Sequence, residues 1–387
     1  MKKILLSSLA CASVLMAAGY KIPENSVNAV ALSNAYVANA HGADASYYNP
    51  ANMVFSSNKG GALEVDVTYI GLSKIDYKSA SGTTNISSKA ENYIVPTFHY
   101  VSPAVNKWRF GLSVVSPVGL SKRWSDSPAS LSAKEFSLQT VEINPTAAYE
   151  LSDNFSVGFG IRGVYSSGVV QNYYYDMKGT GFDWGYNVAA TYKVTKDTNI
   201  AATYRSQIDL HISGDTSRVT AGSNGGVKVT LPMPATASLA VSHTYANATT
   251  IEAVIERNFW SAYKKLDFDF SNPVTNAAFG SPRTKDWKDT DTLRLGLSHT
   301  YEKTTAMIGF AYDPSPVPND TLGYELPDSD GKIFSLGGRY AIDANMNVGI
   351  AGLIDIKDDR KVNNSSINGT FSNSRAYLVT IGMEYKF

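Results

Sequence analysis

The chain has 387 residues, and its 34 Lys and Arg equal its 34 Asp and Glu, so the formal net charge is zero. A balanced charge gives no electrostatic basis for binding nucleic acid, and no such partner is expected. The single cysteine lies near the N-terminus, so neither disulfides nor thiolate chemistry are expected in the rest of the chain. Beyond the N-terminal segment, no apolar run reaches the roughly 18 residues of a membrane-spanning helix. A secreted soluble protein and an outer-membrane β-barrel remain open.

Residues 1–18 have the pattern of a secretory signal peptide. Two lysines precede an apolar stretch at 4–16, and the small residues Ala17 and Ala18 provide a cleavage zone. Lipoprotein processing at Cys11 is the alternative, but it would leave a short apolar stretch, and Ser8 stands where a lipobox prefers leucine. We therefore expect cleavage near Ala17 or Ala18, which would remove the cysteine.

Residues 19–60 do not alternate convincingly between apolar and polar side chains. Within 26–39, Val27, Val30 and Ala31 recur at helical spacing, which predicts a short helix. A barrel of many strands encloses more space than its own side chains fill. We expect residues 19–60 to form a plug, or hatch, in that space, although a tail outside the barrel is the alternative.

Residues 61–387 alternate between apolar and polar side chains with a period of two. In the last segment Tyr377, Val379 and Ile381 share one face, whereas Thr380 lies on the other. This alternation predicts β-strands with one fully apolar face. Fourteen such segments are predicted, with approximate cores at 62–76, 89–100, 108–117, 136–150, 155–170, 182–194, 199–212, 227–243, 249–263, 289–301, 304–313, 332–341, 346–357 and 375–387.

The connections between these segments alternate in length, as in outer-membrane barrels with short periplasmic turns and long external loops. A soluble β-sandwich would explain the strand pattern but not the alternation in loop length. Tyr and Trp cluster near segment ends, as interfacial girdles do. The terminal Phe387 fits a last strand presented to the barrel-assembly machinery. We therefore predict an all-β barrel of antiparallel up-and-down strands, monomeric, among the lipids of the bacterial outer membrane, with both termini periplasmic.

Several blocks of the chain carry motifs. The first is GYKIPENSVNAVALSNAYVANAHGADASYYNPANM, which ends in an Asn-Pro-Ala motif, and the second is SPVGLSKRW at 116–124. Two further blocks are LPMPATASLAVSHTY and, at 312–330, YDPSPVPNDTLGYELPDSD. In this order the blocks resemble the FadL-type family of outer-membrane transporters for long-chain fatty acids and aromatic hydrocarbons. The resemblance covers nearly the whole mature chain.

The resemblance implies a kink in the third strand. In the family this strand bends inward beside the plug, which makes an opening in the wall through which a hydrophobic substrate leaves laterally. The matching positions here are Ser116, Pro117 and Gly119. Pro117 also fits an interrupted strand physically, because it has no N–H to donate to the ladder.

The resemblance also assigns two roles to the plug. It implies that the turn Asn49-Pro50-Ala51 packs at the wall opening, where the rigid proline turn and the Asn49 side chain would satisfy unpaired backbone groups. An ordinary turn that links plug to barrel is the alternative. It further implies that Tyr20 and Ile22 turn into the lumen and form a hydrophobic wall for the ligand.

Four arginines are expected on the lumenal face from the alternation: Arg162, Arg205, Arg294 and Arg339. Most of them should pair with lumenal carboxylates. One or two left unpaired could hold a ligand carboxylate bidentately, and the sequence does not decide which. This favours passive uptake of long-chain fatty acids, with aromatic hydrocarbons as the alternative substrate.

Other functions have weaker support in the sequence. The five histidines are scattered without ligand spacing, and no catalytic motif is present, so neither a metal, a cofactor nor an enzyme activity is expected. The nearest candidate for an outer-membrane protease or phospholipase is His211 with Ser213 and Asp215, but proximity in sequence does not make a triad. A water-filled general porin would give the plug no purpose.

Overall fold

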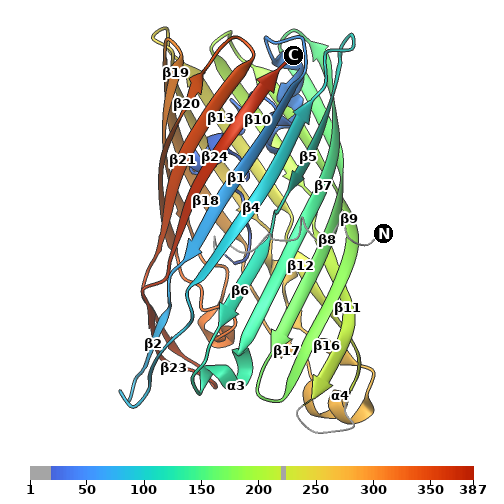
Figure 1. The fold of residues 1–387 in the computed structure, drawn as a ribbon, viewed down its shortest axis with the longest axis vertical. Coiled ribbons are helices and arrows are strands. Elements are labelled where there is room, and N and C mark those ends of the chain that lie inside the picture. Colours follow the sequence, from blue (N-terminus) through green and yellow to red (C-terminus); the bar gives the residue numbers. More distant parts are fainter. Residues whose placement is uncertain (1–18, 219–223) are drawn as a thin grey trace.

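The computed structural model describes residues 19–218 and 224–387, so the expected signal peptide lies outside the described residues. Its main sheet is antiparallel and closes into a barrel, because the first strand pairs with the last from Ala62↔Lys386 to Leu72↔Ala376 (Figure 1). The prediction of a fourteen-stranded barrel is confirmed. None of the helices in the described ranges is long and apolar enough to cross a membrane.

The wall consists of continuous and divided strands. The continuous strands are β1 (Ala62–Leu72), β4 (Glu91–Val101), β7 (Glu135–Ser152), β8 (Phe155–Gln171), β9 (Tyr175–Lys193), β18 (Thr290–Tyr301), β19 (Thr304–Asp313), β20 (Gly331–Ala341), β21 (Met346–Lys357) and β24 (Arg375–Lys386). The divided strands are β5 (Trp108–Val115) with β6 (Gly119–Arg123), β10 (Thr198–Arg205) with β11 (Ile208–Arg218), β12 (Gly225–Met233) with β13 (Thr236–Thr244), and β14 (Thr249–Asn258) with β16 (Phe268–Phe270).

The two ends of the barrel differ in their connections. One end, which we call the short-turn end, carries tight turns such as that between β18 and β19, and the C-terminus lies there (Figure 1). The other, the long-loop end, carries the remaining small elements (Figure 1). These elements are β2 (Asp76–Ser79), β3 (Asn85–Ser87), α3 (Ala129–Ala133), η2 (Trp260–Ala262), β15 (Lys265–Leu266), α4 (Pro273–Phe279), β17 (Arg283–Thr284), η3 (Asn319–Thr321), β22 (Arg360–Asn363) and β23 (Asn368–Ser372).

Two features of the strands differ from the predicted cores. β9 begins at Tyr175, earlier than the predicted start at residue 182, because Tyr175 and Met177 continue the buried face of the strand. The segments predicted at 199–212 and 227–243 are each divided, the second around Pro234. Because proline cannot donate to a ladder, a division at this position has a direct local cause.

The two faces of the wall have opposite character. On β18, Leu293 and Leu295 are 52% and 54% exposed, whereas Arg294 between them is 2% exposed. The same alternation along the strands turns large apolar side chains outward and charged ones inward. An apolar outer face with a polar interior is the arrangement that a lipid bilayer requires of a barrel.

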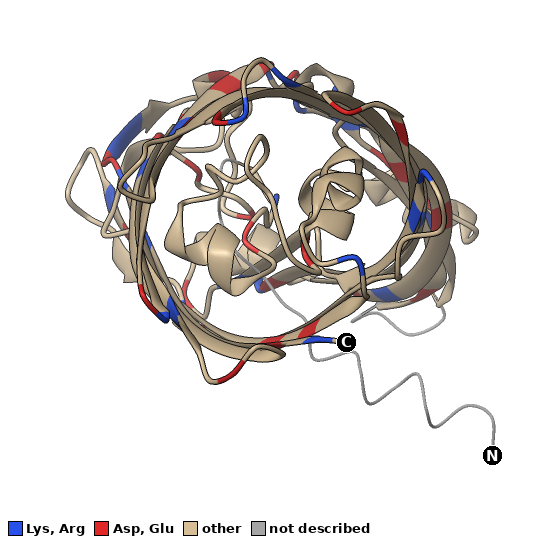
Figure 2. Ribbon diagram, turned by 90° about the horizontal axis from the view of Figure 1, so that it is seen from above, with Lys and Arg blue, Asp and Glu red and all other residues tan. Residues whose placement is uncertain are grey.

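Residues 19–60, which we call the plug, include α1 (Val27–Ala31), α2 (Ala45–Tyr48) and η1 (Pro50–Phe55). Seen along the barrel axis, short helices lie inside the ring of strands (Figure 2). Glycines of the wall allow this close approach. A Cβ on Gly309 would lie 2.2 Å from the carbonyl carbon of Leu32, and one on Gly337 would lie 2.7 Å from Cβ of Ala31.

Candidate ligand site beside an interrupted wall

The ladder between the second and third strands of the wall is interrupted. β4 and β5 are in register from Phe98↔Val114 to Val101↔Gly111, and backbone pairing resumes where the Lys89 N–H donates to the Arg123 carbonyl at 2.8 Å, next to the bridge Ser88↔Trp124. Between these points β5 ends and β6 begins. Ser116 and Pro117 lie in this break, and Gly119 begins β6.

The first residues of the plug pair with this break. The Ile22 N–H donates to the Pro117 carbonyl at 2.8 Å, and the Gly119 N–H donates to the Tyr20 carbonyl at 2.8 Å. Ser116 N–H donates to Oδ1 of Asn25 at 3.2 Å. The plug therefore acts as a short additional strand that satisfies backbone groups which the interrupted ladder leaves unpaired.

The Asn-Pro-Ala turn occupies a different place from the one expected. The carbonyl of Ala51 accepts a hydrogen bond of 2.8 Å from Ser156 on β8, and Asn49 Nδ2 donates to Thr191 on β9 at 2.9 Å. A Cβ on Gly158 would lie 2.6 Å from the Ala51 nitrogen, so the turn can pack here only because residue 158 has no side chain. The contacts place Asn49-Pro50-Ala51 against β8 and β9. Their expected position at the break in the third strand is wrong, because residues 20–25 fill it.

Tyr20 is held by aromatic side chains from the long-loop half of the barrel. Its ring centroid lies 4.8 Å from that of Trp260, 5.7 Å from Trp287 and 6.3 Å from Tyr263. We call these four residues the aromatic cluster. The Tyr20 hydroxyl donates to the Pro232 carbonyl at 2.5 Å. Tyr20 thus has both an apolar enclosure and one satisfied polar group, as buried tyrosines require.

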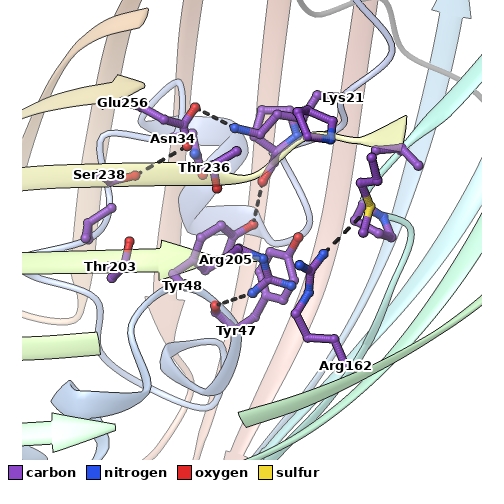
Figure 3. A pocket seen from close by; sticks show the side chains of 16 residues that line it. Lys21, Asn34, Tyr47, Tyr48, Arg162, Thr203, Arg205, Thr236, Ser238 and Glu256 are labelled. Carbon is purple, nitrogen blue, oxygen red and sulfur yellow. Dashed lines mark hydrogen bonds and ion pairs between the residues drawn. The ribbon is translucent and has the colours of Figure 1, made fainter. Parts of the chain in front are cut away.

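A cavity of about 60 Å³ lies next to the break and the plug. Figure 3 shows the side chains that line it, which come from the plug, from the break between β5 and β6, and from strands β8, β10, β12, β13 and β14. Its volume leaves room for only a few water molecules. The lining residues are Lys21, Pro23, Asn34, Val37, Tyr47, Tyr48, Pro117, Val118, Arg162, Thr203, Arg205, Met233, Pro234, Thr236, Ser238 and Glu256.

Two of the four candidate arginines lie together at this cavity (Figure 3). Arg162 Nη2 lies 2.9 Å from Oε2 of Glu142, and Arg205 pairs with the other oxygen of the same carboxylate. Arg162 is 2% exposed and also donates to the carbonyl of Ser206 at 2.8 Å, at the break between β10 and β11. The guanidinium of Arg205 lies 4.3 Å from the ring centroid of Tyr47, a cation–π distance.

The other two candidate arginines hold the plug. Arg294 contacts Glu256 at 3.3 Å and donates to the carbonyl of Ser33 at 2.9 Å. Arg339 pairs with Glu64 and donates to Asn28 Oδ1 at 2.6 Å. Both guanidinium groups therefore bond to groups of the wall and the plug, and neither residue lines the cavity. A lumenal position alone could not separate these two from Arg162 and Arg205.

Lys21 is a site residue that the sequence did not single out. Its ammonium lies 2.6 Å from Oε1 of Glu256 and donates to Asn258 Oδ1 at 2.9 Å. Burial lowers the pKa of Lys21, while the nearby Glu256 carboxylate raises it. Burial raises the pKa of the neighbouring Glu24 to about 7, against the opposing effect of the Arg294 guanidinium. The sequence did contain an indication of this role for Lys21. Lys21 lies between Tyr20 and Ile22, and in an extended segment its side chain points to the face opposite theirs.

The remaining polar candidates do not form a catalytic site. His211 contacts Asp183 through Nδ1 at 2.8 Å, with 67% of its side chain exposed. Its Asp partner therefore comes from β9 rather than from the Asp215 suggested by sequence proximity. Within the described ranges, no group of three or more His, Cys, Asp or Glu residues could hold a metal ion.

A closed barrel with an apolar outer face and a plugged lumen is an outer-membrane channel protein. The chain matches, over residues 8–387, the family described as "Outer membrane protein transport protein (OMPP1/FadL/TodX)". It belongs to this family of outer-membrane transport proteins, whose members are channels rather than enzymes.

Relatives with an assigned role are distant in sequence. The long-chain fatty acid transport protein of Escherichia coli K12 is 24% identical over 334 residues, which cover 70% of this chain and 74% of that one. Outer membrane protein P1 of Haemophilus influenzae Rd is 22% identical, with both chains fully covered.

Solved structures show the same fold. A FadL homologue of Pseudomonas aeruginosa superimposes with a TM-score of 0.84 at 19% identity, covering 96% of this chain and all of that one. The toluene transporter TodX of P. putida gives a TM-score of 0.74 at 16% identity, covering 94% and 98%.

Proposed function

We propose that this protein is a passive uptake channel for long-chain fatty acids and similar amphiphilic carboxylates. The observation that carries the proposal is the arrangement of Arg162, Arg205 and Glu142 beside the cavity. Two guanidinium groups share one carboxylate, so the group has one positive charge in excess. Tyr47 and Met233 give the same cavity apolar surface for a hydrocarbon chain.

Arg205 is the residue that we expect to receive the ligand carboxylate. Its side chain is 17% exposed, whereas that of Arg162 is 3% exposed and makes bonds to Glu142 and Ser206. A guanidinium can bind two carboxylates at once, because it presents five N–H donors in a fixed fork. Arg162 would then position Glu142 and support Arg205 rather than bind the ligand directly.

The cavity is too small for a long acyl chain, so we infer that the first residues of the plug move when the ligand enters. Tyr20 and Ile22 connect the cavity, the aromatic cluster and the break between β5 and β6 through the contacts described above. Withdrawal of this segment would enlarge the cavity and remove the extra strand from the break. Each methylene buried in the enlarged site contributes about 0.8 kcal/mol, enough for a long chain to offset the loss of plug contacts.

We further propose that the substrate leaves laterally through the interrupted wall. The pairing of β4 with β5 stops at Phe98↔Val114, and the short-turn half of the lumen is bonded to the plug on several sides. The proposal includes a removed signal at 1–18, a plug at 19–60 and a barrel at 61–387. In this arrangement the protein is a monomer with both termini in the periplasm and its long loops on the outer side of the membrane. The barrel-assembly machinery would recognise its last strand.

Transport of aromatic hydrocarbons is the second candidate. It is favoured by the aromatic cluster around Tyr20 and by the similarity to a toluene transporter. A neutral hydrocarbon has no need of Arg205. The two candidates therefore differ in their dependence on one side chain.

Binding of oleate, methyl oleate and toluene to the purified protein in detergent tests the proposal. We expect oleate to bind more tightly than its ester. Arg205→Gln should lower the affinity for oleate by roughly tenfold, because one charge-assisted hydrogen bond is lost, and should leave the affinity for the ester unchanged. Arg257→Gln is the matched control, because Arg257 pairs with Asp291 on the exposed surface. Equal affinities for acid and ester would contradict the carboxylate site, and tight binding of toluene alone would favour the second candidate.

A photoreactive fatty acid tests the lateral route. We expect cross-links at residues 91–97 and 115–122, which border the interrupted ladder. Cross-links confined to plug residues 37–53 would instead indicate passage along the barrel axis. Peptide mass spectrometry after irradiation distinguishes the two patterns.

A further inference from the structure

Glu142 is the buried acid that joins the two arginines of the candidate site. It lies on β7 with its side chain fully buried, and it bonds both arginines of the candidate site. It does not line the cavity itself, whereas Arg162 and Arg205 do. Glu142 therefore reaches the cavity only through the two guanidinium groups.

Two other buried acids of the lumen, Glu252 and Glu64, are bound differently. Glu252 accepts three backbone N–H groups of the plug, from Val37, Ala38 and Asn39, at 2.5, 2.7 and 2.9 Å. Glu64 pairs with Arg339, which in turn holds Asn28 of the plug. These two carboxylates fasten the plug directly, but the bonds of Glu142 lead to the ligand site.

We propose that Glu142 sets the carboxylate specificity of the channel by neutralising one of the two guanidinium charges at the ligand site. Without it, two buried guanidinium groups would face each other without a counter-ion, at a large desolvation cost. With it, one positive charge remains for the ligand. This inference rests on the proposed function, because it assumes that the ligand is a carboxylate that binds at Arg205.

The geometry gives Arg205 two sides with different partners. Its Nη2 pairs with Glu142, while its Nη1 is 3.4 Å from the carbonyl of Tyr47, a long contact at the edge of hydrogen-bond distance. Its guanidinium carbon lies over the Tyr47 ring. A ligand carboxylate that approaches from the cavity can replace the long contact and share Arg205 with Glu142. With the ligand bound, the carboxylates of Glu142 and of the ligand balance the two guanidinium groups, and the site is neutral.

A site with balanced charges releases its ligand more readily than one with two unpaired cations. A channel needs binding that is favourable for entry but weak enough for exit. Glu142 would therefore act as a positioning residue that keeps affinity moderate and release fast. Its removal should tighten binding of acids and slow their passage, while leaving neutral ligands unaffected.

The test compares the wild type with Glu142→Gln, which keeps the side-chain shape but removes the charge. We expect oleate to bind roughly tenfold more tightly, as for one stronger charge-assisted contact, while methyl oleate binds unchanged. In proteoliposomes at saturating oleate, the uptake rate should fall. Asp291→Asn is the matched control, since Asp291 pairs with Arg257 at the surface. The folded band on unheated gels verifies that each variant assembles.

Further variants keep the result interpretable. Glu142→Asp retains the charge, and we expect it to keep the acid-to-ester ratio of the wild type even if the barrel is less stable. The gain in Glu142→Gln should disappear when Arg205→Gln is added. An unchanged acid-to-ester ratio in Glu142→Gln, or an equal gain for the ester, would overturn the role of Glu142. Failure of the wild type to prefer acid over ester would instead overturn the proposed function.

Discussion

The plug is held by two different kinds of contact in the two halves of the lumen. Toward the short-turn end, hydrogen bonds and ion pairs dominate, as in the three N–H groups that bind Glu252. Toward the long-loop end, the aromatic cluster encloses Tyr20, and buried Ile208, Leu210 and Ile212 add apolar surface. Directional bonds therefore predominate in the first half, whereas in the second half burial of apolar side chains adds to the bonds of residues 19–25, such as the Lys21–Glu256 ion pair.

The difference bears on how a plugged channel can open. A hydrocarbon can replace apolar contacts without loss, because burial is non-directional and depends on area. It cannot replace a buried hydrogen bond or ion pair, and each broken one leaves an unsatisfied group. The long-loop half is therefore where a hydrophobic ligand can replace apolar contacts of the plug, such as those of the Tyr20 ring, while the short-turn half keeps the plug in the barrel.

The largest effect is expected in the short-turn half. Arg339→Ala removes the partner of Glu64, which is 1% exposed, and the donor to Oδ1 of Asn28 in the plug. An uncompensated buried charge costs about 3–5 kcal/mol. We expect the free energy of unfolding in urea and detergent to fall by this amount.

Lys332→Ala on the same strand is the control for this prediction. Lys332 pairs with Asp358 at 2.6 Å, but about half of each side chain is exposed, so we expect a loss below about 1 kcal/mol. Similar losses in both variants would show that Arg339 does not anchor the plug, and the contrast between the halves would fail.

A second prediction concerns the apolar half. Leu210 is fully buried, and Leu210→Ala should cost about 2–5 kcal/mol through lost transfer energy and a residual cavity. An apolar cavity stays dry and accepts a small hydrocarbon. We therefore expect toluene to raise the unfolding temperature of Leu210→Ala but not that of Arg339→Ala. Stabilisation of both variants, or of neither, would break the comparison.

The sequence predicted the barrel more fully than the site. Strand periodicity is imposed by the bilayer and repeats along the whole chain, so it is visible without any long-range contact. The division of the third strand was also visible, because Pro117 has a local effect. The partners of Arg162 and Arg339 were not, since both arginines have the same alternation and differ only in which distant side chains they meet.

The position of the Asn-Pro-Ala turn shows the limit of a family resemblance. The motif marks a rigid turn, and the structure contains one, with Asn49 Oδ1 accepting from the Ala51 N–H at 3.1 Å. Which part of the wall receives the turn depends on Gly158 and Ser156, far away in the sequence. Local chemistry fixed the shape of the turn, but not its neighbours.

A third prediction tests the packing of this turn against Gly158 on β8. Gly158→Ala would place a Cβ 2.6 Å from the Ala51 nitrogen, so the plug must shift, at a cost of about 1–3 kcal/mol. Gly352→Ala is the control, because its Cβ would meet only the Leu378 carbonyl, at 3.9 Å. Unfolding in urea should separate the two variants. Equal stabilities would place the turn away from β8.

The smallest effect is expected from Tyr20→Phe, which keeps the ring in the aromatic cluster and removes only the hydroxyl that donates to Pro232. The loss of one hydrogen bond should cost about 1 kcal/mol.

Tyr36→Phe is the comparison variant. Its effect should be larger, because the Tyr36 hydroxyl donates to the His41 carbonyl at 2.5 Å and accepts from the His41 N–H at 2.8 Å. Hydrogen exchange of plug amides measures both variants. We expect Tyr20→Phe to speed exchange only near residues 20–25, by roughly fivefold for 1 kcal/mol, and Tyr36→Phe to speed it more, around residues 36–44. The reverse order would mean that the aromatic cluster, rather than the hydrogen-bonded half, retains the plug.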